Sequence, residues 1–112
     1  MSFYTKISTE ITERKILISA LEEMKKRGEI TSFVSNPKTS DIEVDRAGDL
    51  VNLTQEEEGH FVLGGDKLVV GPLTNRVKQF YALEAIKEHL PLDFEIATEE
   101  ESAGEIKLIL KG

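Results

Sequence analysis

The chain has 112 residues, of which 39% are hydrophobic and 31% are charged, a balance typical of a folded globular domain rather than a disordered chain. It contains no cysteine, which excludes disulfide scaffolds, thiolate metal sites and cysteine nucleophiles. The net charge of −7 opposes binding to a nucleic-acid backbone, and no apolar run approaches the roughly 20 residues of a membrane span. We therefore expect one cytoplasmic domain over residues 1–112, with no signal peptide before its first strand.

The first third of the chain predicts a strand, a helix and a second strand. Residues 3–10 alternate between two sides, which is typical of a half-buried strand. Thr12 offers a helix N-cap, an apolar stripe follows at helical spacing, and Gly28 is suited to end the helix in a left-handed conformation. The expected helix covers residues 13–27, and residues 30–34 predict a short strand.

The middle of the chain predicts short strands separated by turns. Between two of them, Gly64-Gly65-Asp66 is typical of a tight hairpin turn, which needs residues that tolerate positive φ. Gly71-Pro72 is expected to end the last strand of this group. The expected strands cover residues 41–45, 50–53, 61–63 and 67–70.

The last third predicts a second helix and two more strands. Thr74 is the expected N-cap of a helix over residues 75–90, and Pro91 prevents its continuation. Residues 92–96 and 105–110 alternate as strands.

The two predicted helices match each other in sequence. Residues 11–30 align without a gap with residues 73–92. The identical positions are Thr12/Thr74, Arg14/Arg76, Ala20/Ala82, Leu21/Leu83, Glu22/Glu84 and Lys25/Lys87. Because each helix lies between strands, we expect two split βαβ halves with the matched alanines and leucines in the core. The predicted fold class is α+β: a ferredoxin-like two-layer sandwich with a mainly antiparallel sheet, two helices on one face and an inserted hairpin.

Several short stretches of the sequence resemble a known protein family. They are Gly48-Asp49-Leu50-Val51, Gly64-Gly65-Asp66, Gln79-Phe80-Tyr81-Ala82 and residues 104–110. The family is a domain-of-unknown-function group of bacteria, cyanobacteria and chloroplast genomes, where it is called a hypothetical chloroplast reading frame. The resemblance implies a cytoplasmic α+β protein without an established reaction, and it provides no functional residues to transfer to this chain.

The two histidines raise the question of a metal site. His60 follows Glu56, Glu57 and Glu58, but a helical zinc pair needs the spacing His-Glu-x-x-His, which the sequence lacks. A solvated acidic loop is the favoured interpretation, and we expect no metal and no other cofactor. His89 falls in the last turn of the second helix, where a cation is favourable on structural grounds alone.

Four more residues are candidates for ligand or interface contacts. Gln79 aligns with Leu17 on the apolar stripe, so its amide either bonds the backbone or faces a cavity. The phenol of Tyr81 is placed to reach a pocket or an interface. Arg14 and Arg76 hold matched positions in the first turns of their helices, which suggests either a pseudo-symmetric anion site or bridges to acids of the sheet. The full candidate set is Gln79, Tyr81, His60, Arg14 and Arg76.

No nucleophile–base set, phosphate loop or dinucleotide fingerprint occurs in the sequence. The leading hypothesis is a non-catalytic module that binds a protein partner or self-associates through exposed sheet edges. The alternative is a small-ligand-binding protein or small enzyme with a pocket between sheet and helices that uses Tyr81, Gln79 and His60. Only Tyr4 beside Lys6 favours nucleic-acid binding through the sheet, and we expect no nucleic-acid or membrane partner.

Overall fold

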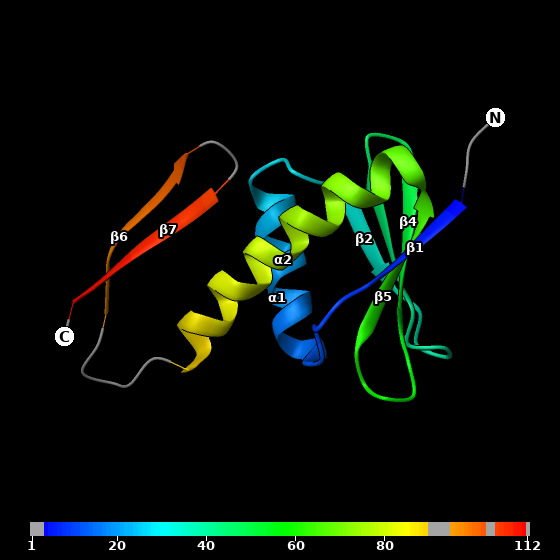
Figure 1. Cartoon of the computed structure of the whole chain (residues 1–112), viewed down its shortest axis with the longest axis horizontal. Helices are drawn as coiled ribbons and strands as arrows, with labels where there is room; N and C mark the ends of the chain where they lie inside the picture. The colour runs from blue at the N-terminus through cyan, green and yellow to red at the C-terminus, as the bar shows by residue number, and fades with distance from the viewer. Residues whose placement is uncertain (1–3, 90–94, 103–104, 112) are drawn as a thin grey trace.

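The computed structural model describes residues 4–89, 95–102 and 105–111, which form two helices and two antiparallel sheets (Figure 1). In chain order the elements are β1 (Tyr4–Ser8), α1 (Arg14–Lys26), β2 (Ser32–Ser35), β3 (Ile42–Arg46), β4 (Asp49–Gln55), β5 (Phe61–Asp66), α2 (Lys67–His89), β6 (Glu95–Ser102) and β7 (Glu105–Lys111). The larger sheet has the strand order β1-β5-β4-β3-β2, and every neighbouring pair in it is antiparallel. The predicted α+β class, with an antiparallel sheet and two helices, is confirmed.

The two helices pack against each other on the same side of the five-stranded sheet (Figure 1). We call the covered side the closed face and the other side the open face. Strand β4 contributes to both, because Val51 and Leu53 are fully buried while Asn52 and Thr54 are exposed. The closed face and the helices share one core, whose fully buried members include Phe61, Leu63, Leu17, Leu21 and Phe80.

Helix α1 agrees with its sequence prediction. It covers Arg14–Lys26, and Gly28 follows it with a φ of +78°, as expected for a residue that ends a helix. The N-cap is Glu13 rather than the predicted Thr12, and it makes no side-chain capping bond. The predicted apolar stripe is fully buried and consists of Leu17, Ala20, Leu21 and Met24.

Helix α2 begins earlier than the sequence predicts, directly after β5 instead of at residue 75. The predicted hairpin turn is therefore wrong: Gly64 and Gly65 lie within β5, and the carboxylate of Asp66 accepts a hydrogen bond from the Leu68 N–H at 2.8 Å. This bond is typical of a helix N-cap. Aspartate is common both in tight turns and at N-caps, so residue type alone does not distinguish a turn from a helix start.

The first turns of α2 also contain residues that were expected to lie outside it. Gly71 and Pro72 are helical, and the proline removes one helical hydrogen bond without ending the helix. Thr74 is not a cap: its side chain is buried, and its hydroxyl has no hydrogen-bond partner among the described residues. Buried Val70 and Leu73 flank the proline, so packing against the core holds this segment helical.

The tight hairpin turn occurs between β3 and β4. Ala47 and Gly48 connect the paired residues Arg46 and Asp49, and their φ angles are +53° and +92°. Positive φ at both central residues gives a turn whose twist matches that of the flanking strands, which favours glycine at this position. The Asp45 carboxylate accepts the Gly48 N–H at 2.8 Å and stabilises the turn.

The ferredoxin-like arrangement of duplicated halves is not confirmed. Helix α1 connects two edge strands of one sheet, whereas α2 connects β5 to β6, which pairs with β7 in a separate two-stranded sheet. The matched positions also differ, because Leu21 and Leu83 are both buried while Ala20 is buried and Ala82 is exposed. Two helices that contribute apolar residues to one core share enough composition to explain the match.

Candidate functional site

The structure gives Arg14 and Arg76 separate surroundings. Arg14 begins α1, and its guanidinium donates to the Ser40 carbonyl and to the Ser35 hydroxyl. Arg76 lies well inside α2, not in a first turn, and contacts Glu29 just beyond the other end of α1. Arg14 and the partner of Arg76 thus lie at opposite ends of α1, which rises about 1.5 Å per residue. The two arginines are therefore far apart and do not face one shared anion site.

Arg76 belongs to a cluster that joins the end of α1 to α2. It donates to Gln79 Oε1 at 2.7 Å and to Glu29 Oε1 at 2.5 Å, and its guanidinium lies 5.1 Å from the centroid of the Phe80 ring. Arg27 lies 5.2 Å from the same centroid. Charge-assisted hydrogen bonds and cation–π contacts of this kind stabilise helix packing. The amide of Gln79 is thus bonded to an arginine rather than to the backbone.

Tyr81 and His60 also lie apart from Gln79. The Tyr81 hydroxyl accepts a hydrogen bond from the Glu13 N–H at 3.2 Å, and its ring is half-buried against the core. Residues two apart in a helix point about 200° apart, so Gln79 and Tyr81 face different directions. His60 lies in the turn before β5, with Nδ1 3.8 Å from Glu58 Oε2. No common pocket of these three residues is present among the cavities described below.

Ionisable side chains meet across the seam between the start of α1 and the end of α2. A hollow of about 330 Å³ there is bordered by both helices. Lys15 Nζ lies 3.6 Å from Glu88 Oε1, and His89 Nε2 lies 3.7 Å from Glu13 Oε2. Exposed pairs of this kind contribute about 1 kcal/mol at most, so we assign this hollow to helix packing.

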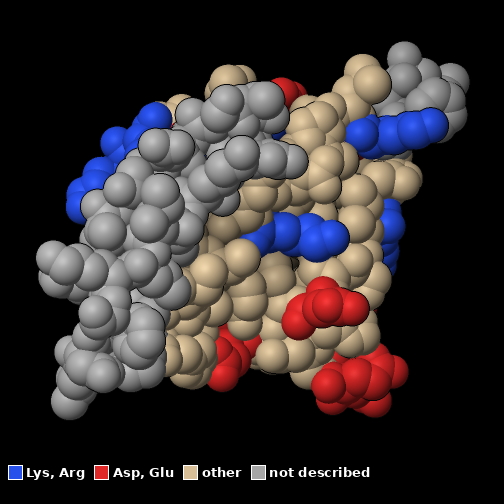
Figure 2. All heavy atoms as spheres, turned by 60° about the vertical axis from the view of Figure 1, so that its left-hand side comes forward, with Lys and Arg blue, Asp and Glu red and all other residues tan. Residues whose placement is uncertain are grey.

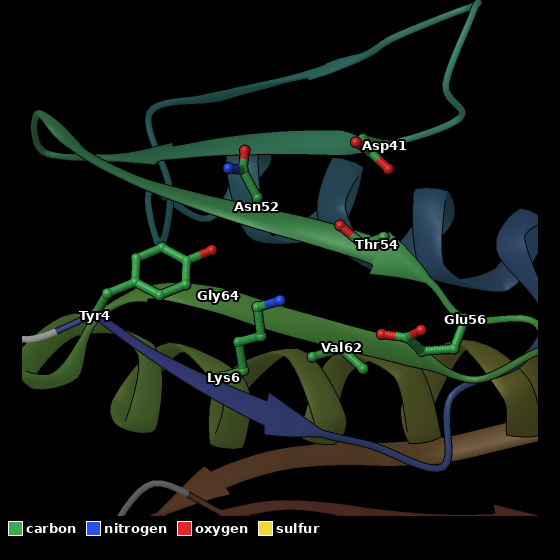
Figure 3. Close-up of a pocket in the computed structure, with 8 residues that line it drawn as sticks. All are labelled: Tyr4, Lys6, Asp41, Asn52, Thr54, Glu56, Val62 and Gly64. Atoms are coloured by element: carbon green, nitrogen blue, oxygen red, sulfur yellow. The ribbon is translucent and has the colours of Figure 1, made fainter.

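A groove on the open face collects polar side chains that are distant in sequence (Figure 3). It measures about 110 Å³. We call it the sheet-face groove; its lining residues are Tyr4, Lys6, Asp41, Asn52, Thr54, Glu56, Val62 and Gly64. They come from β1, β4 and β5 and from the positions just before β3 and just after β4.

Gly64 forms the floor of the sheet-face groove because it carries no side chain. It is paired with Lys6 on one side and with Asn52 on the other, so these two side chains border the gap. The Tyr4 hydroxyl lies over Gly64, where a β-carbon would overlap with it. The glycine thus opens the groove and also lets the Tyr4 ring lie across it (Figure 3).

The polar side chains of this groove have unused hydrogen-bonding capacity among the described residues. Within the part of the chain that the structure describes, the side chains of Tyr4, Lys6, Asn52, Thr54 and Glu56 make no hydrogen bond and no ion pair. Side chains that converge on a concavity with their hydrogen-bonding capacity unused are suited to hold a ligand. Tyr4 and Lys6 are recognisable together in the sequence, but only the fold places Asn52 and Glu56 beside them.

The outer edge of β2 is a second candidate surface. The Asn36 N–H donates to the Asp41 carbonyl at 2.8 Å, toward β3. Backbone groups in an antiparallel pair alternate in direction, so Val34 also faces β3, whereas the N–H and C=O groups of Phe33 and Ser35 point away from the sheet. Within the described residues the β2 edge therefore presents an unpaired backbone, and the Val34 side chain beside it is 65% exposed.

The surface charges do not form a basic stripe on the face shown in Figure 2. Lys and Arg atoms there lie in separate groups, and acidic atoms are visible near the top edge and in the lower part of the same face. A nucleic-acid backbone needs clustered cations on one face. No helix in the described ranges has the length and apolar character to cross a membrane. Among the same residues, no group of histidine and acidic side chains is arranged to hold a metal ion.

No family model, curated protein or solved structure matches this chain. The resemblance to the chloroplast reading-frame family therefore stays a prediction that rests on its short sequence stretches.

Proposed function

We propose that the protein is a cytoplasmic, non-catalytic interaction module that self-associates by pairing the β2 edge of one copy with the β2 edge of another. The observation that carries this proposal is the outward-facing backbone of Phe33 and Ser35 on an edge strand without charged residues. Natural edge strands are usually protected by charge, proline or a covering element. The four residues of β2 include neither a charge nor a proline, and no described strand pairs with its outer edge, so this edge is suited to strand addition.

Only one antiparallel register suits this edge. The N–H of Thr31 is already bonded to the Asp45 carbonyl, and residue 37 is a proline without an N–H. Registers that need either group as a donor are therefore disfavoured. Pairing Phe33 with Ser35 of the second copy uses every outward group and forms four backbone hydrogen bonds around a two-fold axis.

This register also covers an exposed apolar side chain. Val34 would lie on the two-fold axis opposite Val34 of the second copy, in a narrow pair with Cα atoms about 4.5 Å apart. A strand of four residues buries little area, so we expect a weak dimer with a Kd on the order of 10–100 μM. Because each copy carries a net charge of −7, added salt should strengthen the dimer by screening repulsion.

The first test is a proline at the edge. In Ser35→Pro the outward N–H is lost, but the β2–β3 ladder is kept because that N–H does not face β3. We expect sedimentation velocity to show a dimer for the parent protein and at least a tenfold weaker one for Ser35→Pro. Ser35→Ala is the matched control, since it also removes the hydroxyl that bonds Arg14 but retains the N–H.

Charged substitutions at Val34, on the two-fold axis of the proposed dimer, test its symmetry. Val34→Asp and Val34→Lys each place like charges opposite each other, so each variant alone should be monomeric, and an equimolar mixture should dimerise again. Leu50→Lys, which is also exposed on the open face but away from β2, should leave the dimer unchanged. A parent protein that is monomeric up to 1 mM, on the order of ten times the weakest expected Kd, would contradict the proposal.

The geometry gives less support to the alternative of a pocket between sheet and helices. Its three expected residues have separate partners: Tyr81 contacts the start of α1, Gln79 bonds Arg76, and His60 lies beside an acidic turn. The described cavity with unused polar groups lies instead on the opposite face of the sheet.

A further inference from the structure

The sheet-face groove has a direction, because its charged groups are separated along the strands. Lys6 lies in the same cross-strand row as Gly64 and Asn52. The register of β3 and β4 continues to Asp41 opposite Thr54, which is the next row on the open face. Two residues along a strand span about 6.6 Å, so the row of Lys6 and the row of Asp41 are separated by this distance along the strands. Glu43 lies opposite Asn52 in the row of Lys6, but it is not among the residues that line the groove.

A second acid, Glu56, adds to the negative charge at the Asp41 end of the groove. Glu56 follows β4, two residues beyond Thr54, and its carboxylate lies at the same end of the groove as Asp41 (Figure 3). Lys6 is the only cation among the lining residues. The groove thus offers an ammonium group at one end, two carboxylates at the other, and the hydroxyls of Tyr4 and Thr54 beside the path between them.

We infer that the sheet-face groove binds a small linear zwitterion whose carboxylate and ammonium groups are about 6–7 Å apart. The ligand carboxylate pairs with the Lys6 ammonium and the Asn52 amide, and the ligand ammonium pairs with Asp41 and Glu56. The chain between them lies over Gly64 and Val62. Charge complementarity at both ends selects this ligand over one with two charges of the same sign.

The size of the groove limits the ligand to a few heavy atoms. A volume of about 110 Å³ is well below the roughly 300–1,000 Å³ of ordinary ligand pockets, so the groove suits a small ligand. ω-Amino acids of four carbons fit this limit. An extended dipeptide offers the same separation of charges, because each residue spans about 3.3–3.6 Å. The shared chemistry is therefore an unbranched zwitterion, and the experiment distinguishes the two sources.

The test is a titration followed by amide chemical shifts in NMR, with a series of four-carbon probes. 4-Aminobutyrate has one charge of each sign, putrescine has two ammonium groups, and succinate has two carboxylates. We expect 4-aminobutyrate to shift the amides of β1, β4 and β5 with a Kd on the order of 1–10 mM, as suits a ligand of this size in an open groove. Putrescine and succinate should bind at least tenfold more weakly.

Two further probes define the spacing and the source. Glycine carries both charges but holds them close together, so it should bind at least tenfold more weakly than 4-aminobutyrate. Glycylglycine has the extended spacing and should bind comparably if a peptide is the natural ligand. Glycylglycine binding that is clearly weaker than that of 4-aminobutyrate assigns the groove to ω-amino acids. Equal binding of glycine and 4-aminobutyrate overturns the proposed spacing.

Variants connect the shifts to the named residues. Lys6→Met and Glu56→Gln should each weaken 4-aminobutyrate binding at least tenfold, because each removes the partner of one ligand charge. Glu57→Gln is the matched control, since it changes the neighbouring acid outside the groove. Equal binding by the parent and by Lys6→Met overturns the proposal, as does a lack of preference for 4-aminobutyrate over putrescine and succinate. Ser35→Pro, which weakens the proposed dimer without adding a charge to the open face, should bind 4-aminobutyrate normally, and this separates the groove from the dimer.

Discussion

The two faces of the five-stranded sheet are made by the same strands, yet their side chains have different surroundings. On the closed face, Val51 and Leu53 have no exposed surface and pack against the helices. On the open face, Asn52 and Thr54 from the same strand are exposed and make no hydrogen bond or ion pair among the described residues. Packing therefore constrains every second residue, and the residues between them are free to serve recognition.

The surroundings of the two faces differ most clearly at two adjacent glycines. Gly65 faces the closed side, where its position is crowded by Leu50 and Val70, and Gly64 faces the open side, where only the Tyr4 ring lies over it. One glycine is thus required by packing and the other by the shape of a groove. The residue type is the same, and the environment decides its role.

The largest expected difference between the faces is in the stability lost when Leu63 and Val62 are each replaced by alanine. Leu63→Ala leaves a cavity in the core and should lower the free energy of unfolding by about 2–5 kcal/mol. Val62→Ala changes a half-buried side chain on the open face and should cost less than about 1 kcal/mol. Urea unfolding followed by circular dichroism measures both values. Equal losses would mean that the open face is covered in solution.

The next largest difference in stability is expected between alanine substitutions at the two adjacent glycines. In Gly65→Ala the new β-carbon lies 3.1 Å from the Leu50 carbonyl oxygen and from a Val70 methyl group, so we expect a loss of about 1–3 kcal/mol. In Gly64→Ala the clash is with the far end of the exposed Tyr4 side chain, which can swing aside, so the loss should be within about 0.5 kcal/mol. The same urea experiment compares them.

Gly64→Ala should nevertheless change the open face. The displaced Tyr4 ring should alter its NMR signals, and the raised floor should abolish the binding of 4-aminobutyrate. A variant that is fully stable but does not bind would show that stability and recognition are separated between the two faces. Unchanged binding would contradict the role of Gly64 as the floor of the groove.

Periodicity alone predicts the elements that bury one regular face. Helix α1 and strand β3 follow their apolar spacing closely, because helical and strand patterns in these segments point to one core. The start of α2 is not predictable in this way. Its first turns contain Gly71 and Pro72, residues that usually interrupt elements, and only tertiary packing by Val70 and Leu73 keeps them helical.

The candidate surfaces depend on strand order, which the sequence does not contain. Tyr4 and Lys6 are recognisable as neighbours on one side of a strand, but Asn52 joins them only because β5 lies between β1 and β4. In the same way, the predicted short strand after α1 is proposed as an interaction edge only because it lies last in the sheet. The signal that sequence analysis misses is the cross-strand partner, which is set by the fold.

The smallest expected effect concerns a charged pair in the helical layer over the closed face. Arg27 Nε lies 2.9 Å from Glu23 Oε1, and this hydrogen bond, against a smaller opposing effect of burial, lowers the pKa of Glu23 from its ordinary value. A carboxylate with a lowered pKa adds stability above the pKa of the unfolded chain, about 4.3 for glutamate. That contribution is lost as the pH falls through the folded value.

The parent protein should therefore lose more stability than Glu23→Gln between pH 6 and pH 3, by about 0.3–0.5 kcal/mol, the range of pairs four residues apart in a helix. Glu22→Gln is the matched control, because its exposed side chain has no ion pair within the described residues, and it should behave like the parent. Urea unfolding at the two pH values measures the difference. If Glu22→Gln instead reproduced the effect of Glu23→Gln, general charge repulsion in this acidic chain would explain the acid sensitivity, and the paired charge would add nothing to the closed side.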